Sequence, residues 1–298
     1  MVVPAMHLAV ELALLGLLAC VWGSSYLFIK VALSSIPPVS LIALRVAIAA
    51  LFLLAVMGLQ GAKLPRDAAT WRSLLVQALL NSIVTWTLLA WGQQYVDSGI
   101  AGVLTSVSPI FVFLITWLVT RHETTTGWKL TGTALGVAGV VLIMGTSLFG
   151  GLGRELAAQA ALLFGAFLYG CGAIYGKRFV HLPPTVTSAG TMIWATVWLV
   201  PLSLMVDRPW TLRPSTTSLL AALALAVLCT GCALILYFRL VRTLGSMGVA
   251  SQSYLRAGAS VLLGIVFLDE HFSRQTGVGL LAIILGVAAI NVSTRRAA

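Results

Sequence analysis

The chain has 298 residues, of which 59% are hydrophobic and 9% are charged, and its mean hydropathy is +1.02. Soluble proteins carry about 25% charged residues, so this composition excludes a soluble domain and a disordered chain. It predicts an all-α polytopic membrane protein. The formal net charge of +10 is then explained by basic loops that contact anionic lipid, rather than by nucleic-acid binding.

Apolar runs separated by polar or proline-rich breaks predict ten transmembrane helices, each near the roughly 20 residues that a bilayer requires. They leave only about nine residues for each connection, which excludes an extramembrane catalytic domain. The predicted spans are Leu12–Leu33, Val39–Leu59, Leu74–Tyr95, Ile100–Thr120, Leu130–Phe149, Leu156–Gly176, Thr185–Val206, Leu219–Leu240, Val249–Leu268 and Thr276–Val292.

Lysine and arginine are distributed unequally between the two ends of these spans. Five lie at the end that carries neither terminus: Lys30, Arg154, Arg208, Arg213 and Arg274. Eleven lie at the end that carries both termini: Lys63, Arg66, Arg72, Arg121, Lys129, Lys177, Arg178, Arg239, Arg242, Arg295 and Arg296. Cytoplasmic loops carry the excess of positive charge, so both termini are predicted to be cytoplasmic.

The sequence matches itself at an offset of 147 residues, which indicates two repeats, 1–150 and 151–298. The matched pairs are Gly23 with Gly170, Lys30 with Lys177, Pro37 with Pro184, Glu123 with Glu270, Gly132 with Gly279 and Gly139 with Gly286. Each repeat holds five predicted spans, and an odd number makes the second repeat start from the opposite membrane face. Inverted repeats of this kind are typical of secondary transporters, which hold the substrate near the midplane.

Several motifs resemble those of the drug/metabolite transporter superfamily, EamA type. They are the run Trp22–Lys30, Arg45, Ser108-Pro109-Ile110, and Glu123 and Glu270 with the glycines that follow each. The resemblance implies a bacterial inner-membrane (plasma-membrane) carrier of small metabolites, and the layout is similar to the aromatic amino-acid exporters of the YddG group. One departure is Arg256, which stands where many relatives carry proline.

Arg256 is the strongest single functional signal. An arginine near the centre of a span costs about 2.5–3.5 kcal/mol on the insertion scale, which five or six leucines would be needed to offset. No carboxylate is available at the midplane to pair with it. We interpret it as the group that holds the substrate's anionic end, with a structural role as the alternative. For Arg45, a structural role is favoured, either snorkelling or bonding a neighbouring helix.

Polar and aromatic residues near the midplane complete the predicted substrate site, with helix packing as the alternative for each. The predicted substrate-binding residues are Arg256, Trp22, Tyr26, Asn81, Trp86, Tyr175, Gln252 and Tyr254. Gly23, Pro109 and Gly170 are predicted to allow gating movements, with packing again the alternative. Glu123 and Glu270, at span ends, are interpreted as helix caps rather than as proton relays.

These observations predict a secondary transporter that exports small amphipathic metabolites, aromatic or hydrophobic amino acids above all, by alternating access. The expected partners are a small-molecule substrate and the lipid bilayer, without nucleic acid, and the chain is taken as a monomer. No catalytic motif, metal site or cofactor is predicted, so the protein is not expected to be an enzyme. The alternatives are a drug, sugar-phosphate or nucleoside carrier of the same fold, a passive channel, or an intramembrane enzyme acting on lipid-linked substrates.

Overall fold

The computed structural model describes residues 5–118, 127–149, 153–237, 239–240, 252–271 and 273–297, and no strand occurs among them. In chain order the helices are α1 (Ala5–Ala32), α2 (Pro38–Leu59), α3 (Ala68–Ala78), α4 (Val84–Gly92), α5 (Ser98–Thr105), α6 (Ser108–Leu118), α7 (Gly127–Phe149), α8 (Arg154–Tyr175), α9 (Pro184–Val206), α10 (Thr216–Ala226), α12 (Gln252–Leu268) and α13 (Arg274–Ala297). Two π-helical segments, η1 (Leu79–Ile83) and η4 (Val227–Cys232), and two short 3₁₀ helices, η2 (Gly176–Phe179) and η3 (Pro209–Thr211), complete the list.

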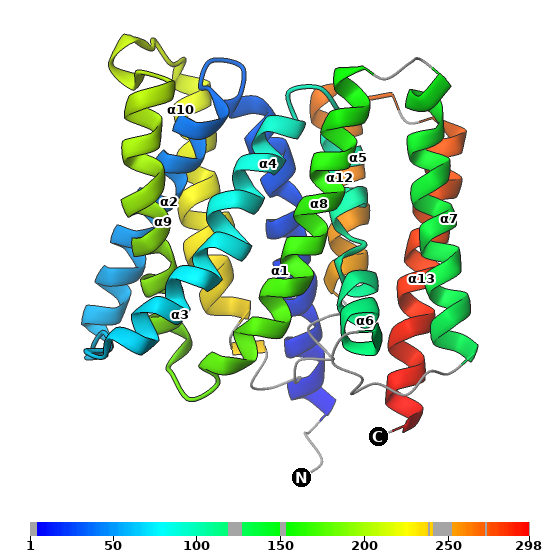
Figure 1. Cartoon of the computed structure of the whole chain (residues 1–298), viewed down its shortest axis with the longest axis horizontal. Coiled ribbons are helices and arrows are strands. Elements are labelled where there is room, and N and C mark those ends of the chain that lie inside the picture. Colours follow the sequence, from blue (N-terminus) through cyan, green and yellow to red (C-terminus); the bar gives the residue numbers. More distant parts are fainter. Residues whose placement is uncertain are drawn as a thin grey trace.

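The helices stand side by side as one bundle (Figure 1). Eight helical segments among the described residues are long and apolar enough to cross a bilayer, and the apolar stretches Leu255–Leu268 and Arg274–Ala289 are shorter. The prediction of a helical membrane protein is thus confirmed, while the count of ten spans stays a prediction. The first turn of α1 and the last turn of α13 lie at the same end of the bundle, which we call the terminal end.

Several helices begin at proline or beside a capping side chain, the residue types that favour helix starts. Pro38 and Pro184 open α2 and α9, where the missing N–H of proline removes no helical hydrogen bond. The side chains of Asp67 and Ser215 accept backbone N–H groups at the starts of α3 and α10. These signals place the described helix boundaries within six residues of most predicted ones.

The predicted span Ile100–Thr120 corresponds to one candidate membrane span, Ser98–Leu118, within which the helix is interrupted. A turn at Ser106 and Val107 separates α5 from α6. Pro109 is the second residue of α6, a position in the first helical turn that tolerates proline. The break therefore leaves the start of α6 inside the bundle rather than at its surface.

Glycines allow the closest helix contacts, most clearly between α7 and α13. A Cβ atom added to Gly286 would lie 2.5 Å from the carbonyl oxygen of Gly132 and 2.7 Å from the nitrogen of Gly136. Close backbone approach of this kind is the main source of helix association in lipid, where burial of apolar surface gives no net gain. The two helices form a pair at one side of the bundle (Figure 1).

Candidate functional site

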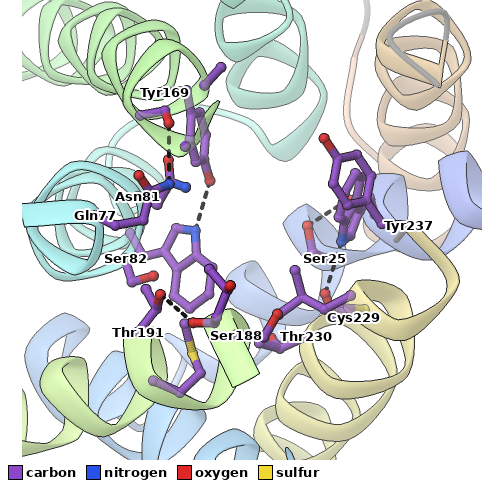
Figure 2. Close-up of a pocket in the computed structure, with 18 of the residues that line it drawn as sticks. Ser25, Gln77, Asn81, Ser82, Tyr169, Ser188, Thr191, Cys229, Thr230 and Tyr237 are labelled. Carbon is purple, nitrogen blue, oxygen red and sulfur yellow. Dashed lines mark hydrogen bonds between the residues drawn. The ribbon is translucent and has the colours of Figure 1, made fainter. Parts of the chain in front are cut away.

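A cavity of about 600 Å³ lies inside the bundle, within the size range of small-molecule sites. Its wall comes from α1, α2, α3, α4, α6, α8, α9, α12, the 3₁₀ helix η2 and both π-helical segments. Figure 2 shows Asn81 and Tyr169 on one side of the cavity and Ser25 and Tyr237 on the other. Lining residues continue to Lys177 and Pro184, in and after the turn that joins α8 to α9, so the cavity extends toward the terminal end.

Arg45 is the most deeply buried cation of the cavity wall, with 5% of its surface exposed. Its guanidinium carbon lies 3.7 Å from the centroid of the Trp86 ring, and its Nε donates to the Thr230 hydroxyl at 2.9 Å. The Trp86 indole in turn donates to the Tyr169 hydroxyl at 2.8 Å. Within the described residues the terminal guanidinium nitrogens of Arg45 have no hydrogen-bond partner, so their N–H groups are available to a ligand.

Arg256 is the second guanidinium of the cavity and comes from α12. Its Nε is buried and has no hydrogen-bond partner among the described residues. The span around Arg256 was predicted from Val249, but residues 249–251 lie outside the described residues, and Arg256 is the fifth residue of α12 as described. Gln252 and Ser253, in the first turn of the same helix, also line the cavity.

The two π-helical segments place polar groups on the cavity wall. Asn81 and Ser82 belong to η1, and Cys229 and Thr230 belong to η4. The Cys229 carbonyl oxygen accepts the indole N–H of Trp22 at 3.1 Å, a bond between a span of the first half and one of the second. Single π-helical turns inside α-helices are frequent at functional sites, because they free backbone groups from the regular ladder.

Most of the predicted binding residues meet at this cavity. Trp22, Tyr26, Asn81, Trp86, Gln252 and Arg256 all line it. Tyr175 does not, because its ring lies beside Phe179 and the guanidinium of Arg178 instead. Tyr254 lies on α12, and its side chain is outside the described part of the structure. The binding roles themselves stay predictions.

The residues predicted to act in gating lie at helix contacts. A Cβ atom on Gly23 would lie 2.6 Å from that of Ala259, so this glycine lets α1 approach α12. Gly170 faces Phe111 in the same way, with 3.2 Å to its Cβ atom. Pro109 follows the break between α5 and α6. These positions show close packing for both glycines, and their movement stays a prediction.

Sequence reasoning missed several residues of the wall. Arg45 was expected to bond a neighbouring helix, which agrees with its bond to Thr230, and it also lines the cavity. Lys177 and Thr191 line the cavity too, and neither was predicted to do so. The sequence signals for Arg45 were its charge inside an apolar run and its match to the family pattern, and neither distinguishes a cavity wall from a helix contact. The π-helical turns that rotate Ser82 and Cys229 to the cavity carry no pattern that hydropathy can reveal.

Two charged side chains tie helix ends together at the end of the bundle opposite the terminal end, which we call the closed end. Lys30 of α1 donates to the carbonyl oxygens of Gln93 and Val96, just beyond α4, at 2.9 and 2.7 Å. Glu270, beyond α12, accepts the backbone N–H groups of Ser98 and Gly99 at 2.6 and 3.0 Å. A cation beyond a helix C-terminus and a carboxylate at a helix N-terminus both match the helix dipole. Glu270 was expected to cap the helix that follows it in the sequence, but in the structure it caps the start of α5. Glu123, the other predicted cap, lies outside the described residues.

Apolar helices surround a mainly apolar cavity that carries a few polar and charged groups, an arrangement typical of small-molecule sites and here placed in a membrane protein. The comparisons identify its kind. The chain belongs to the EamA-like transporter family, whose model matches residues 11–145 and again residues 156–292. It is therefore a membrane transporter, as its relatives are named.

Relatives that match about nine tenths of the chain share only about a quarter of the aligned residues with it. The "Uncharacterized inner membrane transporter YedA" of Escherichia coli is 27% identical over 91% of this chain and 87% of that protein. A "Probable amino-acid metabolite efflux pump" of the same species is 25% identical over 91% of each chain. A solved crystal structure superposes with a TM-score of 0.69 over 95% of this chain and 97% of that one, and its 20% identity shows a shared fold alone.

Proposed function

We propose that this chain is a secondary transporter that exports small amphipathic metabolites by alternating access, with aromatic and hydrophobic amino acids as the first candidates. We place it in the bacterial inner membrane, as ten spans in two inverted five-helix repeats, 1–150 and 151–298, with both termini in the cytoplasm. The cavity would then face the cytoplasm in the conformation described here. A relative named as an amino-acid metabolite efflux pump supports this substrate class.

The composition of the cavity wall is the observation that carries the proposal. Trp22, Tyr26 and Trp86 offer aromatic surface to the apolar part of a substrate. Arg45 and Arg256 offer forked N–H groups that suit a carboxylate. An aromatic surface beside a carboxylate-binding group is the pairing that an aromatic amino acid needs.

The contrast between the two ends of the bundle supports alternation. The 147-residue offset relates Lys30 to Lys177. Lys30 is bonded to two carbonyl oxygens at the closed end, whereas Lys177 lines the open cavity at the terminal end and has no hydrogen-bond partner among the described residues. In the opposite state we expect Lys177 to bond and Lys30 to be released. The same offset carries η1 onto residues 226–230, which overlap η4.

A sugar-phosphate carrier of the same fold is the second candidate. One observation favours it: the cavity wall holds two guanidinium groups rather than one, and phosphate recognition typically uses more than one cation. A competition assay distinguishes this candidate from an amino-acid exporter, because a sugar phosphate would displace the bound substrate and an amino acid would not.

Uptake into proteoliposomes of the purified chain tests the proposal, with a panel of radiolabelled amino acids and unlabelled competitors, with and without a pH gradient. We expect uptake of at least one aromatic or hydrophobic amino acid or close derivative, and displacement by other aromatic compounds. A folded protein that moves no member of the panel would contradict the amino-acid assignment.

A further inference from the structure

The carboxylates of the chain all lie away from the cavity as far as the structure describes them. The sequence has eight: Glu11, Asp67, Asp97, Glu123, Glu155, Asp207, Asp269 and Glu270. Glu123 is outside the described residues, and none of the other seven lines the cavity. Each is at a helix end, in a connection or, for Glu11, in an ion pair with Arg239 near the terminal end. The described cavity wall therefore carries no negative charge.

Positive charge, in contrast, gathers on the cavity wall from several elements. The guanidinium-bearing residues Arg45, from α2, and Arg256, from α12, both line the cavity. Lys177 adds an exposed ammonium group where the cavity nears the terminal end. Ser108, the first residue of α6, also lines the cavity, so the partial positive charge of a helix N-terminus lies near it.

Cations on a cavity wall without a nearby anion raise the free energy of the folded protein. A charge inside a membrane protein is normally paired with an opposite charge or with backbone carbonyls. The Arg45 guanidinium has a neutral hydroxyl and an aromatic face, and the buried Nε of Arg256 has no described partner. A substrate anion would supply the missing negative charge. An ammonium group in the same space would meet two like charges and find no carboxylate to bind.

We propose that the preferred substrates are amphipathic organic anions with a net negative charge, so that an amino-acid derivative whose ammonium group is masked or removed binds better than the parent zwitterion. This inference rests on the proposed transport function and narrows its substrate class. The apolar part of the anion would contact Trp86 and Trp22, and the charged end would bridge Arg45 and Arg256. Lys177 would raise the local concentration of anions at the mouth of the cavity.

The test compares ligands that share one phenyl ring and differ in charge. N-acetyl-L-phenylalanine carries −1, L-phenylalanine is a zwitterion, and phenethylamine carries +1. Binding to the purified full-length protein is measured at pH 7 by ligand-dependent thermal stabilisation over a concentration series. We expect the N-acetyl compound to bind about tenfold or more tightly than phenylalanine, and phenethylamine to give no stabilisation. Equal or tighter binding of phenylalanine would overturn the inference, as would binding of none of the three.

Variants then test whether the two arginines carry the preference. Arg45→Met and Arg256→Met keep most of the side-chain length without the charge, and each should weaken binding of the N-acetyl compound about tenfold or more. The lysine variant at each position keeps the charge without the fork and should lose less. Arg213→Met, which removes an exposed cation in the connection before α10, is the matched control and should bind as the wild type does. Binding of the anion that survives both methionine variants would contradict the inference.

Transport measurements separate this inference from the function on which it rests. If phenylalanine is transported and the anion is not preferred, the transporter stands and the inference fails. If the anion binds in an arginine-dependent way but no compound crosses the membrane with the folded protein present, the inference stands and the proposed transport of this class fails. Protein-free liposomes correct for passive entry of the uncharged acid.

Discussion

Glu270 offers the sharpest test of how the closed end is held. Glu270→Ala removes the carboxylate that accepts the backbone N–H groups of Ser98 and Gly99 and leaves both donors without that partner. Both residues are buried, and Ser98 is 0% exposed, so without the carboxylate their N–H groups are poorly hydrated unless α5 and the segment after α12 separate. The substitution should therefore favour opening at this end.

The expected magnitude follows from the two hydrogen bonds. A hydrogen bond to a charged group contributes about 1.5–3 kcal/mol, so two contribute about 3 kcal/mol at the lower end of that range. If the open state lacks both bonds, the equilibrium between closed and open shifts about 100-fold, since 1.4 kcal/mol corresponds to a factor of ten. Glu270→Gln keeps one carbonyl acceptor without the charge and should give about half of this free energy.

Amide hydrogen exchange of peptides from the first turn of α5 measures this opening directly. We expect protection there to fall about 100-fold in Glu270→Ala. Asp67→Ala is the matched control, because Asp67 accepts the N–H of Thr70 at the exposed start of α3, and its effect should stay within α3. Unchanged exchange at the start of α5 in Glu270→Ala would refute the closing role of the carboxylate.

Three further substitutions test the site, the packing and the pH dependence. Trp86→Phe removes the indole N–H and replaces the ring on which the Arg45 guanidinium stacks with a weaker partner, so substrate affinity should fall about tenfold. Trp128→Phe, at an exposed position outside the cavity, should leave affinity unchanged in the same binding assay. Gly286→Ala places a Cβ against backbone atoms of α7 and should cost about 1–3 kcal/mol of stability, seen as a lower Tm, while Gly16→Ala, with open space around it, should be neutral or slightly stabilising. Burial, and secondarily a neighbouring carboxylate, raise the pKa of Asp97. The stability that the protonated Asp97 contributes to the folded state is therefore fully present below the ordinary carboxyl pKa of about 4. It is lost as pH rises through the raised pKa of the folded state, because the carboxyl group then ionises where its charge is disfavoured. Asp97→Asn should accordingly lose less Tm between pH 4 and pH 7 than the wild type, and a parallel decline would contradict this.

Hydropathy was sufficient to predict the helices, because a bilayer span requires a long apolar run and the chain has little else. The eight spans that meet the length and hydropathy of a membrane helix all overlap predicted ones. The break between α5 and α6 was not predicted, although Pro109 marks it. A proline in a long apolar run is compatible with a kink, a new helix start or a lipid-facing position, and only the packing of neighbours decides among these.

The cavity was predicted less completely than the helices. Trp86 and Arg256 were found because aromatic and charged residues are unusual at the midplane. Tyr175 met the same criterion, yet its ring lies near Phe179 in the structure. Which face of a helix a residue occupies depends on rotation, and the π-helical turns in η1 and η4 change that rotation without a sequence signature. Arg45 was expected to bond a neighbouring helix, and it does so at Thr230, but its place on the cavity wall was not predicted because its stacking partner, Trp86, comes from another span.

Counterflow in proteoliposomes tests the central claim, that this chain carries a substrate by alternating access through the cavity. Vesicles preloaded with unlabelled substrate are diluted into labelled substrate at low concentration. With alternating access, label accumulates transiently above its external concentration, because each inward step of the carrier with label follows an outward step with unlabelled substrate. We expect this overshoot to be lost in Arg45→Met. A channel would instead let label enter only until its internal and external concentrations are equal, whatever the internal substrate. That result would contradict alternating access.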